Sequence, residues 1–276
     1  MKLAAAITTP EVPVQVPVAL FSGSFEERLD KAAALGYAGV ELMALDPSRL
    51  RAPEIAGAIR DRGLEAPALG TGAQFLVDRL TLIAGDADTE RRAIERFERL
   101  ADFAAGVGCP LVTIGSFRGK LAWGGEGARG RLVEALRRCA ETAGRRGLRV
   151  ALEPLNRYEN DHLNTVAEVL DVIQELGAPN LRLLADTFHM NIEEVDIAAS
   201  LRQAGPHLGH VHLVDSNRQA PGHGHLDVAG VLQALAGIGY RGYLSFEVLP
   251  LPDPRRAAED GLRTVRDLAA PPPARR

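Results

Sequence analysis

Short apolar runs alternate with longer amphipathic stretches along most of this chain. The short runs have the length and composition of buried strands, and the longer stretches repeat apolar residues at helical spacing. The expected strands are residues 3–8, 38–42, 65–69, 111–115, 149–153, 181–186, 209–214 and 242–248. The expected helices are residues 25–35, 53–62, 89–106, 132–147, 165–176, 197–204, 227–238 and 253–268. Alternation of this kind predicts an α/β protein built from βα units.

Local signals mark several of these boundaries. Ser24 is placed to cap the first helix and Gly36 to end it, and Asp227 is placed to cap the seventh. Residues 70–86 and 117–130 contain glycine and lack periodicity, so we expect two mobile loops above a barrel mouth. The segment 269–276 is Pro-rich and charged, and we expect it to be a disordered tail after a single domain over residues 1–268.

Two α/β architectures, a doubly wound open sheet and a closed barrel, could produce this alternation of strands and helices. A doubly wound open sheet usually carries a Gly-rich nucleotide loop after its first strand, of the form GxGxxG or GxxxxGK[ST]. The turn here reads TTPEVPVQVPV and has neither pattern. The length of 276 residues is ordinary for one (β/α)8 TIM barrel, which we therefore predict.

Composition argues against nucleic acids and membranes as binding partners. The net charge of −4 and pI near 6.0 argue against a nucleic-acid-binding surface. Residues 1–12 read better as a first strand than as a signal segment, and no apolar run reaches the ~20 residues that span a bilayer. Cys109 and Cys139 form no CxxC pair and fit small buried side chains in a reducing compartment. We expect a cytoplasmic protein without membrane or nucleic-acid partners.

Four polar residues stand at the ends of expected strands. They are Glu153, Asp186, His212 and Glu247, separated by 33, 26 and 35 residues, close to the roughly 31 residues of one unit in a ~250-residue barrel. The carboxyl ends of barrel strands converge on one mouth, so these side chains are expected to share a centre. Like charges at a shared site need a cation between them.

The donor set indicates which cation. Three carboxylates and one imidazole make an oxygen-rich site that suits Mn²⁺, Mg²⁺ or Co²⁺ better than a thiolate-type zinc centre. We expect one divalent ion, Mn²⁺ first, with Mg²⁺, Co²⁺ or Zn²⁺ as alternatives. Such an ion can hold two neighbouring oxygens of a hydroxy-ketone and polarise its carbonyl, which makes the adjacent proton removable by a carboxylate base.

The segments around these four residues resemble a known family. LEPLNRYEN (152–160), LLADTFHMNIEE (183–194), GHVHLVDSNRQAPGHGHLD (209–227) and GYLSFEVLP (242–250) are similar to the xylose isomerase-like barrel superfamily, and most to its D-tagatose and D-psicose 3-epimerase branch. The resemblance is strong from 150 to 250 and is limited to a general barrel pattern before 110. It implies a metal-dependent sugar epimerase or isomerase that acts on a ketose or keto-sugar acid through a metal-bound enediolate.

The resemblance also implies roles for particular residues. Glu153, Asp186, His212 and Glu247 would be the metal ligands, and Glu153 and Glu247 would double as the catalytic acid/base pair on opposite faces of C3. The residues expected to hold the substrate's oxygens are Glu159, His189 and Arg218, and those expected to support the loops are Asn156 and Asn164. Glu41 ends the second strand and could either reach the mouth or form a salt bridge.

Other readings of the same barrel stay open. An aldose–ketose isomerase of the hydroxypyruvate isomerase type would use the same enediolate, and dehydratases of keto sugars and a non-catalytic sugar-binding protein are further alternatives. His223 and His225 could serve a second metal, as in endonuclease IV-like hydrolases, but those use histidines from earlier strands and this chain has none before His162. The partner we expect is a small-molecule sugar, and a homodimer or homotetramer remains open.

Overall fold

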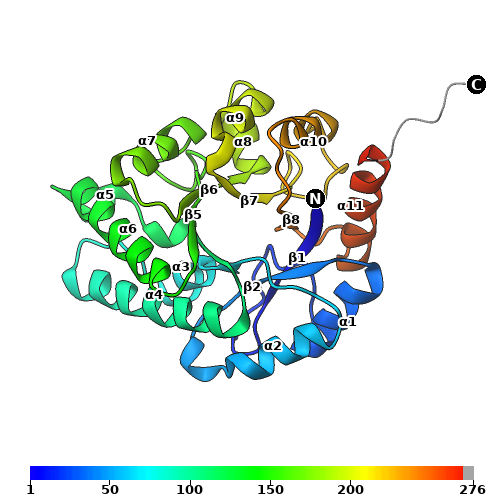
Figure 1. The fold of residues 1–276 in the computed structure, drawn as a ribbon, viewed down its shortest axis with the longest axis horizontal. Helices are drawn as coiled ribbons and strands as arrows, with labels where there is room; N and C mark the ends of the chain where they lie inside the picture. Colours follow the sequence, from blue (N-terminus) through cyan, green and yellow to red (C-terminus); the bar gives the residue numbers. More distant parts are fainter. Residues whose placement is uncertain (270–276) are drawn as a thin grey trace, which may run out of the picture.

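The strands of this chain close into a parallel barrel in sequential order, β1 to β8, with β8 pairing back onto β1. The computed structural model describes residues 1–269. Figure 1 looks into the ring of strands, which the longer helices surround. The strands are β1 (Lys2–Thr8), β2 (Gly39–Met43), β3 (Leu69–Gly70), β4 (Leu111–Ile114), β5 (Arg149–Leu152), β6 (Leu181–Asp186), β7 (Leu208–His212) and β8 (Tyr243–Phe246). The predicted (β/α)8 barrel is confirmed.

Helices follow the strands around the ring. The α-helices are α1 (Phe25–Leu35), α2 (Ala52–Arg60), α3 (Gly72–Asp78), α4 (Ala87–Val107), α5 (Leu121–Gly124), α6 (Ala128–Gly144), α7 (Val166–Leu176), α8 (Thr187–Glu193), α9 (Ile197–Ala204), α10 (Val228–Gly237) and α11 (Pro254–Ala269). Three 3₁₀ turns, η1 (Pro47–Arg49), η2 (Ser116–Arg118) and η3 (Gly205–His207), lie between them in the described part of the chain. No helix within residues 1–269 is both long and apolar enough to cross a membrane.

Capping residues set the helix ends as the sequence predicts. The Ser24 side chain accepts a hydrogen bond from the Glu27 amide while Glu27 accepts one from the Ser24 amide, so α1 begins with a capping box. Gly36 ends α1 in the left-handed conformation at φ 84°, which glycine adopts without steric cost. Asp227 caps α10 by accepting from the Gly230 amide.

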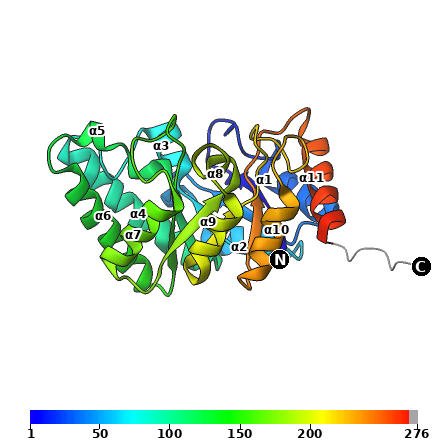
Figure 2. The ribbon, with the colours of Figure 1, turned by 90° about the horizontal axis from the view of Figure 1, so that it is seen from above.

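Several predicted boundaries were wrong. Strand β3 is reduced to Leu69–Gly70, because Pro67 lacks the N–H that a longer ladder would need. The first predicted mobile loop, 70–86, contains helix α3, and the second, 117–130, contains α5 and the start of α6. Figure 2 shows α3 and α5 along one edge of the molecule, with the N-terminus near the other. Ala269, expected to start the tail, is the last residue of α11, and residues 270–276 of that tail lie outside the described residues.

The two faces of the strands carry different side chains. Outward-facing residues such as Val40, Leu42 and Leu183 pack with the helices in one large apolar core. Inward-facing Ala68, Leu111, Ala151 and Leu184 fill one part of the barrel interior. Several other inward positions towards the carboxyl ends of the strands are polar, among them Glu41, His212 and Ser245.

Candidate active site

The four predicted strand-end residues meet inside the barrel mouth. Asp186 and His212 are the last residues of β6 and β7 and lie side by side in the register of these strands, while Glu153 and Glu247 directly follow β5 and β8. The Nδ1 atom of His212 lies 3.4 Å from Glu153 Oε1, 3.6 Å from Asp186 Oδ2 and 3.7 Å from Glu247 Oε2. One ligand atom from each residue lies within 4.8 Å of all the others.

The atoms that face one another in this quartet have no other partner. Glu153 Oε1, Asp186 Oδ2 and His212 Nδ1 are buried and make no hydrogen bond. Buried polar atoms are costly to leave unpaired, so three of them converging on one point indicate a ligand-binding site. Three carboxylates and one imidazole nitrogen at this spacing fit a divalent cation. The structure therefore contains a candidate metal-binding cluster.

Glu153 is held at the mouth by its neighbours on β4 and the following turn. The carboxylate lies against Gly115, where any Cβ would overlap Glu153 Oε2. The Arg118 guanidinium donates 2.7 Å to the Glu153 carbonyl and also to the carbonyls of Gly115, His162 and Leu163. Arg118 is fully buried, and burial lowers its pKa to about 10. This one side chain therefore ties the β4 turn, the end of β5 and the loop at 162–163 together.

Glu41 lies deeper in the barrel than the quartet and contacts it through His212. It extends from β2 into the barrel, where its Oε1 accepts from His212 Nε2 at 3.1 Å and its Oε2 from His210 Nε2 at 2.8 Å. His210 Nε2 also lies 3.0 Å from Ser245 Oγ. Of the two possibilities that the sequence left open for Glu41, the structure shows a contact at salt-bridge distance, and its partner is a histidine of the quartet.

Burial and close charges shift the acidities of these groups in opposite directions. Burial raises the pKa of Glu247 to about 8, and the charges of Glu153 and Asp186 add to that rise against those of His212 and Arg218. Burial opposes ionisation of Asp186 too, but the interactions with His189 and His212 outweigh it and lower the Asp186 pKa to about 2. Burial would lower the His212 pKa, yet Glu41 and Glu247 raise it well above its usual value.

His189 lies beside the quartet on α8. Its Nδ1 accepts hydrogen bonds from Asn156, from the backbone amide at 3.3 Å and from the side-chain amide at 2.8 Å. A neutral imidazole that accepts at Nδ1 carries its proton at Nε2, and that atom lies 3.9 Å from Asp186 Oδ2. His189 thus presents an N–H to the centre, and Asn156 fixes its orientation.

Arg218 closes the other side of the centre. Its Nη1 donates to Glu159 Oε1 at 2.7 Å, its Nη2 lies 3.7 Å from Glu247 Oε2, and the guanidinium lies 4.9 Å from the Phe188 ring centroid. The backbone of Arg218 is left-handed at φ 62°, which costs roughly 1 kcal/mol for a residue with a Cβ. Backbone hydrogen bonds to Asp215 and from Leu249 hold it there.

These side chains line a cavity of about 300 Å³. Its inner wall is polar and includes Glu153, Glu159, His189, His212, Arg218 and Glu247. Most of its apolar lining comes from the first half of the chain: Val16, Val18, Met43, Ala73, Phe75 and Leu76. All three residues that the sequence predicted as substrate contacts therefore line the same cavity as three of the four candidate ligands.

Two histidines whose role the sequence left open lie outside the quartet. His223 Nε2 is 3.1 Å from Asp260 Oδ2 of α11, and His225 is exposed with its amide bound to Ser216 Oγ. Neither belongs to the quartet, so the structure gives no support to a second metal ion held by these histidines in the described residues. Asn164 bonds to the carbonyls of Leu155 and Asn160 and so supports the loop, as expected.

Sequence reasoning missed His210 and Arg118. His210 had a usable signal, because it precedes His212 by two residues on one strand and so shares its inward face. Arg118 had none, since it lies in a Gly-containing segment and its acceptors are backbone carbonyls up to 45 residues away.

Comparison with known proteins shows that this chain is similar to sugar epimerases. The chain is 30% identical to the 3-dehydro-D-guloside 4-epimerase of Escherichia coli over 267 residues, which cover 90% of this chain and 96% of that enzyme. It is 44% identical to the D-psicose 3-epimerase of Enterocloster bolteae over 117 residues, which span 42% of this chain but only 39% of that enzyme's length. The relatives named here are epimerases, enzymes of the isomerase class.

A solved structure extends the likeness over the whole barrel. The crystal structure of D-allulose 3-epimerase from Methylomonas sp. in complex with D-allulose matches with a TM-score of 0.78 at 26% identity, covering 96% of this chain and 97% of that one. The family described as xylose isomerase-like TIM barrel matches residues 29–268. This chain is a member of the xylose isomerase-like TIM barrel family, as the resemblance in its strand-end motifs implied.

Proposed function

We propose that this protein is a divalent-metal-dependent sugar epimerase that exchanges a proton at the carbon next to a carbonyl group. The observation that carries the proposal is the quartet, in which three buried polar atoms without partners converge beside a sugar-sized cavity. Similarity to ketose 3-epimerases and to a 4-epimerase that matches along nearly its whole length supports the reaction class.

Glu153, Asp186, His212 and Glu247 would hold the metal ion, with Mn²⁺ as the expected ion because the donors are mostly carboxylate oxygens. A divalent cation held there polarises a substrate carbonyl and stabilises the negative charge that develops when the neighbouring carbon loses its proton.

The protein's own groups carry the proton. Glu153 and Glu247 follow strands β5 and β8, which stand three places apart around the barrel, so their carboxyl groups approach the centre from different sides. One carboxylate takes the proton from one face of the substrate carbon, and the other, protonated, returns a proton to the opposite face. The configuration inverts and the pair is left with the proton exchanged between its members, so the reverse reaction uses the same two groups in opposite roles.

Three further residues would orient the substrate. The N–H of His189 and the guanidinium of Arg218 point donors at its oxygens, and Glu159 accepts from a hydroxyl while it holds Arg218 in place. Arg218 is the one Lys or Arg among the residues that line this cavity in the described structure, and Glu159 already pairs with it. A sugar without a phosphate group suits this charge balance best.

Deuterium exchange tests the proposal and separates its alternatives. A panel of free ketoses is incubated in D₂O with protein that carries Mn²⁺, and the position of the label is read by NMR. Label at C3 together with the C3 epimer is the expected result. Label at C1 with an aldose product would instead identify an aldose–ketose isomerase, and label at C4 of a 3-keto sugar a 4-epimerase. Absence of exchange with every sugar, with and without metal, would refute the proposal.

A further inference from the structure

A buried charged network lies directly beneath the candidate metal ligands. Glu41, His210, His212 and Ser245 are each at most 2% exposed, and three of them meet through the two carboxylate oxygens of Glu41. The interior of such a barrel is ordinarily filled by branched apolar side chains, and an ionised carboxylate placed there is costly unless it is paired. The barrel thus carries a paired carboxylate at a place where such barrels ordinarily have an apolar side chain.

The strand register makes room for this carboxylate. Glu41 lies opposite Ala6 of β1, and Ser245 of β8 lies opposite Ala4 of the same strand. Because all these positions point inward, the two alanines leave the volume into which the longer side chains extend. His210 and His212 reach the same volume from β7, on the far side of β8.

Hydrogen-bond chemistry fixes the protonation of His212. An ionised carboxylate can only accept, so His212 must carry a proton on Nε2, the atom that faces Glu41 Oε1. In the neutral imidazole the lone pair is then on Nδ1, the atom that faces Glu153, Asp186 and Glu247 at 3.4–3.7 Å. His210 occupies the second oxygen of Glu41 and prevents the carboxylate from turning away.

We propose that Glu41, held by His210, is a positioning residue that keeps His212 in the tautomer and orientation needed to bind the metal ion. The inference rests on the metal centre of the proposed function. A carboxylate behind a ligating histidine also makes the imidazole a stronger donor, and loss of such a partner typically lowers metal affinity by 10–100-fold. Glu41 is not among the residues that line the cavity, so we expect it to act through His212 and not through contact with the substrate.

The variant Glu41→Gln tests this role. The amide has nearly the same shape, but one of its two terminal atoms is a donor nitrogen, so the histidine that faces this atom loses its acceptor. We expect the Kd for Mn²⁺, measured by calorimetric titration of chelator-treated protein, to rise by about 10–100-fold. We expect the KM for a sugar at saturating Mn²⁺ to stay within twofold. Glu65→Gln is the matched control, because Glu65 is an exposed carboxylate that also accepts from two side chains, Lys2 and Tyr243.

A second measurement does not depend on the variant. In the wild-type protein loaded with diamagnetic Zn²⁺, the ¹⁵N NMR shifts of His212 report which nitrogen carries the proton. A proton on Nε2, hydrogen-bonded to Glu41, is the expected result. A proton on Nδ1, or metal bound through Nε2, would overturn the inference, even if Glu41→Gln failed to fold.

The outcomes separate this inference from the proposed function. If wild-type protein binds no Mn²⁺, the metal centre itself is wrong. If wild type binds Mn²⁺ and Glu41→Gln binds it within twofold as tightly, the centre stands and Glu41 is only a structural residue.

Discussion

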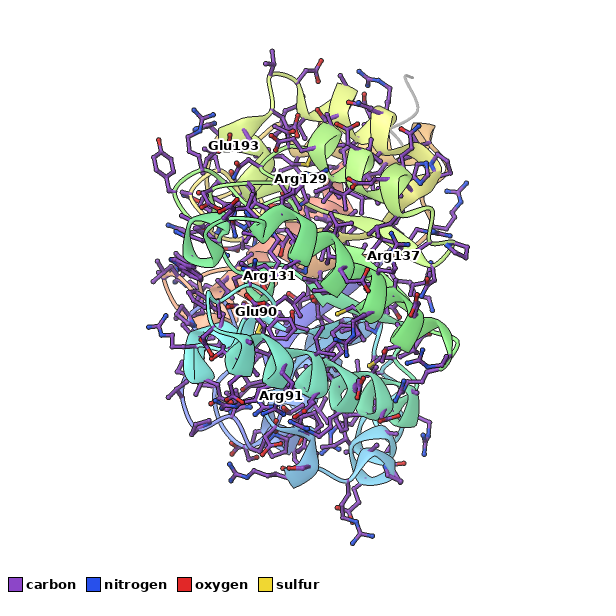
Figure 3. All side chains as sticks on the ribbon, turned by 90° about the vertical axis from the view of Figure 1, so that its left-hand side faces the viewer. Glu90, Arg91, Arg129, Arg131, Arg137 and Glu193 are labelled. Carbon is purple, nitrogen blue, oxygen red and sulfur yellow. The ribbon has the colours of Figure 1, made fainter. Side chains whose placement is uncertain are left out.

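Charged side chains on the outer face over α4 and α6 differ from those inside the barrel mouth in how they are paired. Figure 3 looks onto the outer face, where Arg91 projects from α4 and Arg129, Arg131 and Arg137 from α6. Each of these arginines has a carboxylate partner within 3.4 Å. Inside the mouth, by contrast, the facing atoms of Glu153, Asp186 and His212 have no partner.

The two regions show why counting charges says little about function. The outer pairs are exposed to solvent, so each contributes little to stability and any of them could be lost at small cost. The inner groups are buried away from solvent, and burial of a polar atom costs free energy. Nothing within the described chain offsets this desolvation cost for the three unpaired atoms. A charge that the fold buries and leaves unpaired indicates a site for a ligand, whereas a paired surface charge does not.

The largest expected effect comes from removing an inner carboxylate. In Glu153→Gln and Glu247→Gln, one proton-transfer group is lost while the shape is kept, and we expect proton exchange to fall by about 10²–10⁴-fold. The rate of deuterium incorporation followed by NMR measures this. The outer-face variant Glu175→Gln is the control and should exchange at the wild-type rate. If both inner variants exchanged protons within threefold of the wild-type rate, these carboxylates would not be the proton-transfer groups.

The free energy of unfolding of an Arg118 variant tests the importance of buried charge in the inner region. Arg118→Met deletes a buried charge and leaves the carbonyls of Gly115, Glu153, His162 and Leu163 without their donor, so we expect a loss of about 3–5 kcal/mol in the free energy of unfolding. Urea titration measures it. The matched variant Arg137→Met on the outer face should change stability by less than about 0.5 kcal/mol. Equal losses in both variants would contradict the contrast.

The pH dependence of Mn²⁺ affinity tests the protonation of the same region. In the metal-free protein the Glu247 pKa of about 8 means that this carboxyl is largely protonated at pH 7, and metal binding must displace the proton. We expect Mn²⁺ affinity to rise about tenfold from pH 6 to pH 7 through Glu247 alone, and this contribution to level off above pH 9. Calorimetry in buffers of different ionisation enthalpy counts the released protons. Binding at pH 7 without proton release would show that the acidities assigned to the site are wrong.

The smallest effect is expected on the outer face. Arg129 and Glu175 form a solvent-exposed pair between α6 and α7. A double-mutant cycle to alanine should give a coupling of about 0.2–1 kcal/mol that falls further in high salt. A coupling above about 2 kcal/mol would mean that the outer network stabilises the barrel after all.

Much of this molecule could be predicted from the sequence because its key residues stand at strand ends. The four ligand candidates each follow an apolar run, and barrel geometry then brings positions far apart in the chain to one mouth. The family resemblance, and not a position at a strand end, predicted His189, Glu159 and Arg218 as substrate contacts, and all three line the cavity. Their roles remain predictions, because geometry shows only that they meet.

What could not be predicted depends on contacts between distant segments. Glu41 and His210 are 169 residues apart, and no local pattern says that they share an ion pair across the barrel. Helices α3, α5 and α8 have only 7, 4 and 7 residues, too few for a 3.6-residue repeat to stand out from loop sequence. The third strand was predicted at 65–69, but its bounds were wrong, since the two residues of β3 are too few to show a period.

Calorimetric titration of chelator-treated protein with Mn²⁺ tests the central claim most directly. We predict one tightly bound ion per chain in the wild type, and a loss of affinity of at least 100-fold in Asp186→Asn, which keeps an oxygen to cap α8 but removes the charge from the centre. The control Glu175→Gln should bind as the wild type does. If the wild type takes up no ion, or Asp186→Asn binds it equally well, the quartet is not a metal centre.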